Sequence, residues 1–169
     1  LFFIDSVTVK KHLYTLASDD MKGRRAGTAG IEKAAKYIEN EFKRIGLTTF
    51  ESLETYRQTF NFKPRSSKEE ITSANIIGVL EGKSKKDEYV IVSAHYDHLG
   101  NEGKGEDKIY NGANDDASGV TGVLALAEYF KKVGNERTIV FVAFTAEEMG
   151  LIGSTHFGKG IDANKFVAG

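Results

Sequence analysis

Apolar residues recur along this chain with two different periods, and the change of period marks the expected elements. Spacing close to 3.6 residues predicts four helices, at residues 6–17, 29–45, 117–133 and 151–158. Thr28 stands where it can cap the second helix, and Gly46 and Gly134 follow the second and third helices as C-terminal stops.

The remaining apolar segments predict strands. They lie at residues 48–62, 74–80, 89–94 and 137–144, and residues 161–167 lead into a further strand. The unbroken runs 89–94 and 137–144 are typical of strands buried on both faces, whereas the charged run 83–88 is predicted to be a solvated loop. Because a helix separates the two unbroken runs, we expect them to be parallel through a right-handed crossover, which makes the fold class α/β.

Composition narrows the possible functions. A length of 169 residues indicates about one domain, and a net charge of −1 gives no overall attraction to nucleic acid or acidic membrane. No apolar run approaches the roughly 18 residues that a membrane span needs. The absence of cysteine excludes disulfides and thiolate metal ligands.

The first polar cluster follows the run 89–94. His95 and Asp97 are two residues apart at a strand end, so both side chains point to the same side. A carboxylate beside an imidazole can orient it for metal binding. A core histidine bonded to its neighbour is the alternative, and parity places His98 on the opposite face.

The second cluster is Asn114-Asp115-Asp116, which lies between glycines just before a helix. One aspartate can give an oxygen to each of two cations, and the cations would offset the repulsion between adjacent carboxylates. Helix capping by Asp116 is the alternative, but it leaves the second acid and the flanking glycines unexplained.

The third cluster, Glu147-Glu148, follows the apolar run 137–144. One glutamate can ligate a metal while the other acts as general base on the metal-bound water. Exposed glutamate pairs are common on helices, but this pair stands where a buried strand ends. Imidazole and carboxylate donors suit zinc, with cobalt or manganese as substitutes.

Each of the three clusters is interpreted as lying at the end of a strand. In open α/β sheets, sites lie outside the carboxyl ends of the strands, so the pattern predicts a hydrolytic metal site. A His-Glu-x-x-His helix and a Gly-x-Ser-x-Gly elbow are absent. The glycine-rich turn 22–30 lacks the ending of a phosphate loop, and its Arg24 and Arg25 are expected to be structural or surface residues rather than a substrate clamp.

Several segments together carry a family resemblance: residues 16–24, Gly27-Thr28-Ala29-Gly30, and residues 93–100, 112–119 and 147–154. They resemble the M28 family of zinc metallopeptidases. The resemblance implies a three-layer α/β/α fold with a mixed, largely parallel sheet. It also implies two zinc ions and hydrolysis of N-terminal peptide bonds in a peptide substrate.

The resemblance assigns roles by position. His95 would bind one zinc and Asp97 would orient it. Asp115 would bridge the two zincs, and members of the family often have a cis peptide directly after this residue. Glu147 would be the general base, and Glu148 would bind the second zinc.

The chain also departs from the family pattern. Residues 63–73 leave no room for a protease-associated insert, and no residue after Glu148 stands in the context of the two remaining zinc ligands, since His156 and Asp162 are misplaced. Residues 1–169 are therefore expected to be the N-terminal portion of one catalytic domain. Alone it should be inactive, bind zinc weakly, and expose a strand edge that permits self-association.

Three alternatives to a zinc aminopeptidase stay open. They are a glutaminyl-cyclase-type acyltransferase with a single zinc, a non-catalytic receptor-like module of the same fold, and a carboxypeptidase or dipeptidase of the same family. The resemblance alone supports an extracytoplasmic location, either periplasmic or secreted.

Overall fold

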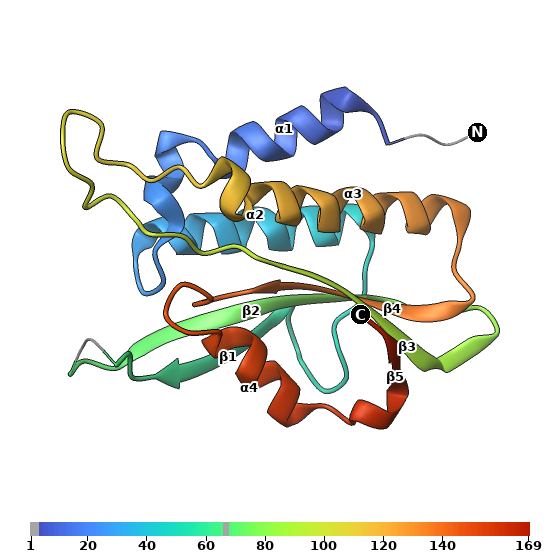
Figure 1. Cartoon of the computed structure of the whole chain (residues 1–169). Helices are drawn as coiled ribbons and strands as arrows, with labels where there is room; N and C mark the ends of the chain where they lie inside the picture. Colours follow the sequence, from blue (N-terminus) through green and yellow to red (C-terminus); the bar gives the residue numbers. More distant parts are fainter. Residues whose placement is uncertain (1–3, 66–67) are drawn as a thin grey trace.

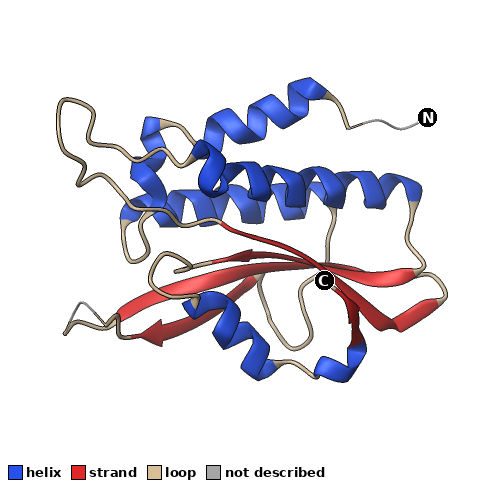
Figure 2. Ribbon diagram, in the orientation of Figure 1, coloured by secondary structure: helices blue, strands red, loops and turns tan. Residues whose placement is uncertain are grey.

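A five-stranded sheet forms the middle of three layers in the computed structural model, which describes residues 4–65 and 68–169 (Figure 1). The strands are β1 (Arg57–Phe62), β2 (Ile71–Leu80), β3 (Lys85–His95), β4 (Arg137–Phe144) and β5 (Phe166–Ala168). The helices are α1 (Ser6–Leu16), α2 (Ala29–Ile45), α3 (Ser118–Val133) and α4 (Ile152–Gly160), with short turns η1 (Asp19–Arg24), η2 (Ala113–Ala117) and η3 (Ala163–Lys165). Helices α1, α2 and α3 lie on one face of the sheet and α4 on the other (Figures 1 and 2).

The sheet is mixed, and its order is β1-β2-β4-β3-β5. Strand β2 pairs antiparallel with β1 and β4, whereas β3 pairs parallel with β4 and β5. Every strand except β2 therefore runs in the same direction. This confirms the predicted three-layer α/β fold with a largely parallel sheet.

Strand β4 separates two apolar cores, which explains its unbroken apolar sequence. Ile139, Phe141 and Ala143 pack in the core shared with α2 and α3, while Val140 and Val142 pack in the core that includes Phe157 of α4. Because successive side chains of a strand point to opposite faces, a strand covered on both faces must be apolar at every position.

The other apolar run, 89–94, is less buried than predicted. Ser93 is exposed and Tyr89–Val92 are only partly buried. The reason is that β3 has the three-residue strand β5 as its outer neighbour, so less of its surface is covered.

Three further predictions about the elements need correction. Residues 48–56 are not strand, apart from one isolated bridge between Thr48 and Val79. Lys85 is already paired with Arg137, so the charged run is partly strand whose side chains stay in solvent. Thr28 occupies the N-cap of α2, but its Oγ1 donates to the Arg25 carbonyl at 2.7 Å instead of accepting from the helix.

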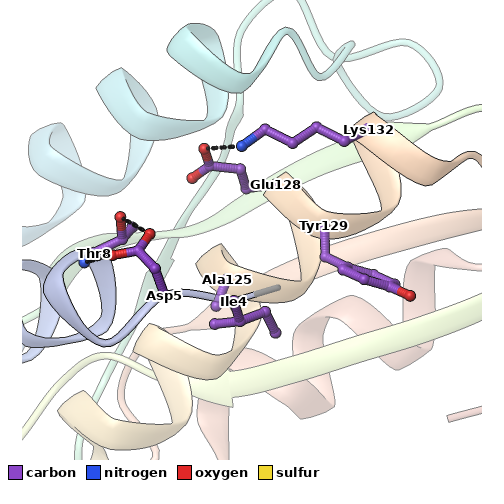
Figure 3. A pocket seen from close by; sticks show the side chains of 7 residues that line it. All are labelled: Ile4, Asp5, Thr8, Ala125, Glu128, Tyr129 and Lys132. Carbon is purple, nitrogen blue, oxygen red and sulfur yellow. Dashed lines mark hydrogen bonds and ion pairs between the residues drawn. The ribbon is translucent and has the colours of Figure 1, made fainter. Parts of the chain in front are cut away.

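A small hollow between the start of α1 and the later turns of α3 is lined by Ile4, Asp5, Thr8, Ala125, Glu128, Tyr129 and Lys132 (Figure 3). Its charged groups already have partners, since Asp5 accepts from the N–H groups of Val7 and Thr8 and Glu128 pairs with Lys132. The hollow joins two helices and contains none of the three clusters. Among the described residues, no helix combines the length and apolarity required to cross a membrane.

Candidate metal centre

The parallel pairing of β3 with β4 brings two of the clusters together. His95, the last residue of β3, is in register with Phe144, the last residue of β4. Both strands therefore end at the same edge of the sheet. Strand β3 is followed by Asp97, and β4 is followed by Glu147-Glu148. The η2 turn before α3 contacts β3 and contributes Asp115.

His95 lies at the meeting point of the three clusters. Its Nε2 is 3.0 Å from Asp115 Oδ1 and 3.9 Å from Glu147 Oε2. Its side chain is largely buried, whereas that of Asp115 is 59% exposed. An imidazole nitrogen and an aspartate oxygen thus converge beside a general-base candidate.

Asp97 is buried, and both of its carboxylate oxygens accept hydrogen bonds from the backbone of the third cluster. Oδ1 accepts the Glu147 N–H at 2.9 Å and Oδ2 accepts the Glu148 N–H at 3.2 Å. Oδ1 is also 3.6 Å from His95 Nδ1, and the Asp97 backbone carbonyl is 3.2 Å from the same nitrogen. One side chain therefore sets the position of the Glu147-Glu148 backbone and neighbours the His95 ring.

The two adjacent aspartates do different things. The peptide bond between Asp115 and Asp116 is cis, as the resemblance implied. Asp116 accepts from the Gly119 N–H at 2.9 Å and from the His95 N–H at 3.2 Å, so it joins α3 to the end of β3. A Cβ at Gly119 would lie 2.3 Å from Asp116 Oδ1, which accounts for a glycine there. Asp115 remains to face the histidines.

His98 is in the site, and its predicted place on the opposite face is wrong. Its Nδ1 is 2.6 Å from Glu148 Oε1 and 3.9 Å from Asp115 Oδ2. One donor atom from each of these three residues forms a group within 4.8 Å. The parity argument fails because β3 ends at His95, and alternation has no meaning beyond the last strand residue.

The two later candidates lie elsewhere, as expected. The His156 ring stacks on Phe60 with centroids 4.0 Å apart. Asp162 caps the short η3 turn by accepting from the Asn164 N–H at 3.0 Å.

Arg24 is the supporting residue that sequence reasoning did not place. It is fully buried, and its guanidinium donates to the carbonyls of Tyr96 at 2.9 Å, Asn111 at 2.7 Å and Gly112 at 3.0 Å, as well as to that of Leu16. Burial lowers the pKa of Arg24, although the charges of Asp97, Asp115 and Asp116 oppose this. Arg24 is therefore a structural residue, and the alternative expectation of a surface position is wrong. It joins the loops after β3 and before η2 to the N-terminal segment.

The acidic surroundings of His95 affect the pKa of its imidazole. Burial works against its protonation, but the hydrogen bond and charge of Asp97 and the charges of Asp116 and Glu147 outweigh burial and raise the pKa of His95 to about 9. A divalent cation would have to displace that proton, because a ligating imidazole nitrogen must be unprotonated.

The donors fit zinc chemically. His95, Asp115 and Glu148 offer imidazole nitrogen and carboxylate oxygen, which are donors that zinc accepts. His98 and Glu148 also border an open cavity of about 310 Å³, lined in addition by Arg25, Pro64, Arg65, Leu99, Met149 and Gly150. The site is therefore accessible to a ligand larger than water.

Comparison with known families agrees with this reading. The model of a family described as "Peptidase family M28" matches residues 75–168, which is more than half of the chain and contains all three clusters. The chain belongs to peptidase family M28. The resemblance inferred from the motifs is thereby confirmed.

The chain is also similar to individual proteins in sequence and in fold. The aminopeptidase YwaD of Bacillus subtilis (strain 168) is 41% identical over 87 residues, which are 51% of this chain and 17% of that protein. A glutaminyl cyclase of Fimbriiglobus ruber is 26% identical with a TM-score of 0.78, covering 94% of this chain and 56% of that one. A Zn-dependent exopeptidase from Parabacteroides distasonis ATCC 8503 has the same fold, with a TM-score of 0.78 and 18% identity over 98% of this chain and 59% of that one. The chain thus spans little more than half of these structures.

Proposed function

We propose that the protein is a zinc-dependent aminopeptidase in which this chain supplies the general base and part of the zinc ligands. The observation that carries the proposal is the convergence on Asp115 of His95, at 3.0 Å, and of the pair His98 and Glu148, with Glu147 at 3.9 Å from His95. The names of the relatives support it, since an aminopeptidase and a Zn-dependent exopeptidase are among them.

The roles follow from how each side chain is held. His95, Asp115 and Glu148 would hold two zinc ions, with Asp115 shared between them. When bound, zinc supplies Lewis acidity that polarises the scissile carbonyl and makes a water more acidic. The Glu147 carboxylate is 36% exposed while its backbone is fixed by Asp97, which suits a group that takes a proton from water and passes it to the leaving amine.

Residues 1–169 supply fewer protein ligands for each proposed zinc than a catalytic zinc usually has. Catalytic zinc usually has three protein ligands, whereas each proposed zinc would have Asp115 plus either His95 or Glu148. The chain spans only part of its relatives. We therefore propose that the remaining ligands lie outside residues 1–169, so weak zinc binding and no turnover are expected for residues 1–169 alone.

The first test is zinc content after dialysis, measured on residues 1–169 and on a form that continues downstream. About two zinc ions per chain in the longer form alone, together with hydrolysis of aminoacyl peptides, is the expected result. Tight stoichiometric zinc in residues 1–169 would contradict the ligand assignment. No metal in either form would favour the receptor-like module.

One observation favours a second candidate, a glutaminyl-cyclase-type acyltransferase. The Fimbriiglobus ruber structure with that name matches this chain at a TM-score of 0.78. Incubation with a peptide that begins with glutamine separates the two reactions, because a cyclase releases ammonia and a blocked peptide, whereas an aminopeptidase releases free glutamine.

The proposal also includes self-association and a cellular location. Strand β5 lies at a sheet edge, and an unpaired strand edge can add another chain, so residues 1–169 are proposed to self-associate at high concentration. An extracytoplasmic location is proposed on family resemblance, and fractionation of cells that produce the protein tests it.

A further inference from the structure

His98 makes the shortest contact with Glu148 at the candidate metal centre, and the residue has no assigned role. We propose that His98 is a positioning residue: its Nδ1–H holds one oxygen of Glu148 and leaves the other oxygen free for the metal. The inference deepens the proposed function and rests on its metal centre.

The separation of the two atoms favours a hydrogen bond over shared coordination. His98 Nδ1 is 2.6 Å from Glu148 Oε1, slightly shorter than the roughly 2.7–2.9 Å of a charge-assisted hydrogen bond from nitrogen to a carboxylate. Two donors on one tetrahedral zinc, each about 2.0–2.1 Å from the ion, lie roughly 3.3 Å apart. The observed distance is therefore too short for both atoms to bind the same zinc.

The His98 ring is itself held in place. Its backbone N–H donates to the Arg24 carbonyl at 3.2 Å, and its side chain is only 11% exposed. A Cβ at Gly112 would lie 2.6 Å from the ring carbon Cδ2, so the ring rests directly against the backbone of the loop before Asp115. A ring with so little freedom can fix its partner.

Glu148 is consequently restrained at both ends. Asp97 accepts its backbone N–H at 3.2 Å, and His98 engages one carboxylate oxygen. Ligating carboxylates are commonly hydrogen-bonded by a neighbour, and removing such a partner typically lowers metal affinity about 10–100-fold. Asp115 Oδ2, at 3.9 Å from His98 Nδ1, is left outside the bond.

The test compares His98→Ala and His98→Asn in the longest available form of the protein, with His156→Ala as the matched control. The asparagine amide can donate from nearly the place of Nδ1, but it is a poor zinc ligand. We expect His98→Ala to lower zinc affinity about 10–100-fold, His98→Asn to retain most of it, and His156→Ala to leave it unchanged. Competition with a chromophoric chelator measures affinity, and circular dichroism checks that each variant is folded.

A second readout does not depend on activity. In nitrogen-15-labelled protein, the imidazole spectrum shows whether Nδ1 of His98 bears a proton before and after zinc is added. A retained Nδ1–H supports the positioning role.

Two results would overturn the role while leaving the metal centre intact. One is a His98→Ala variant with unchanged zinc affinity. The other is loss of the Nδ1 proton on zinc binding with His98→Asn as damaging as His98→Ala, which would make His98 a ligand. Absence of zinc from the wild-type protein would instead remove the metal centre and this role with it.

Discussion

At the scale of single residues, four acids of the candidate site divide into two kinds. Asp97 and Asp116 give their oxygens to backbone N–H groups, whereas Asp115 and Glu147 keep exposed carboxylates. Asp115 and Asp116 are neighbours of the same type in the sequence. Only the folded backbone makes one a structural group and the other a candidate ligand.

Glu147 provides the most direct test of the chemistry. Replacing Glu147 with Gln removes the proposed base but keeps the shape, so turnover by the proposed zinc enzyme should fall about 10²–10⁴-fold with nearly unchanged zinc content. Steady-state kinetics and metal analysis on the same samples measure both. A matching loss of zinc would mean that Glu147 is a ligand.

Arg24 should contribute more to the free energy of unfolding than the adjacent Arg25. Lysine cannot reproduce a guanidinium that donates to four carbonyls, and the buried bonds to the carbonyls of Leu16 and Tyr96 would be the most costly to lose. We expect Arg24→Lys to lower the free energy of unfolding by about 3 kcal/mol or more. Urea denaturation measures the change, and Arg25→Lys, which removes one long bond to Leu99, should cost much less. Equal effects would contradict the structural role of Arg24.

The sequence could place His95, Asp115, Glu147 and Glu148 near one another, because strand ends are recognisable from apolar runs. It could not place His98 or the contacts of Arg24. His98 lies past the strand, where a loop sets the direction of the side chain. The partners of Arg24 are carbonyl groups from 8 to 88 residues away, and every residue has a carbonyl, so no pattern of side chains reveals them.

At the scale of elements, the helices were easier to predict than the strands. Helix α2 begins and ends where the 3.6-residue period and Gly46 predict. Strand formation depends on neighbours that are distant in sequence. Residues 48–56 have only an isolated bridge between Thr48 and Val79 in place of a continuous partner, while Lys85 at the start of β3 pairs with Arg137 although its sequence predicts a loop.

Gly23 stands where the backbone requires a glycine, whereas Gly122 stands where an alanine would fit. Gly23 has φ +66° and its Cβ would lie 2.1 Å from the Gly100 carbonyl oxygen, whereas a Cβ at Gly122, inside α3, would meet nothing within 4 Å. We expect Gly23→Ala to destabilise the protein by at least about 2 kcal/mol and Gly122→Ala to stabilise it by about 0.5–1 kcal/mol. Thermal and urea unfolding measure both, and a stable Gly23→Ala protein would show that the two loops need not approach so closely.

At the scale of the whole molecule, the pH dependence of folding should carry a contribution from His12. This residue of α1 is fully buried, its Nε2 has no partner in the described structure, and its Nδ1 is 2.7 Å from the Tyr37 hydroxyl. Burial lowers its pKa below 6.5; Lys11 and Arg44 lower it further, and Glu41 and Glu128 oppose them. The folded chain therefore binds this proton less readily than the unfolded chain.

Acid should weaken the folded chain through His12. The contribution of His12 to stability is full above pH 6.5 and is lost as the pH falls through the range between that value and the lower folded-state pKa. His12→Phe keeps an aromatic ring and cannot be protonated, so the variant should lack this part of the acid-side decline. Urea unfolding at several pH values measures the difference, with His156→Phe as an exposed control. Parallel pH profiles for wild type and His12→Phe would contradict the prediction.

The arrangement around Arg24 also orders the events of synthesis. Leu16 is made before Arg24, but the carbonyls of Tyr96, Asn111 and Gly112 follow it by 72, 87 and 88 residues. At usual translation rates this interval is roughly 4–18 s, during which the guanidinium lacks these three acceptors. The contacts of Arg24 in a nascent chain therefore cannot be completed until the loops of the candidate site have left the ribosome. A chain that stalls or is damaged in those loops would present an unfinished amino terminus to chaperones and proteases, so quality control of the scaffold is at the same time quality control of the site.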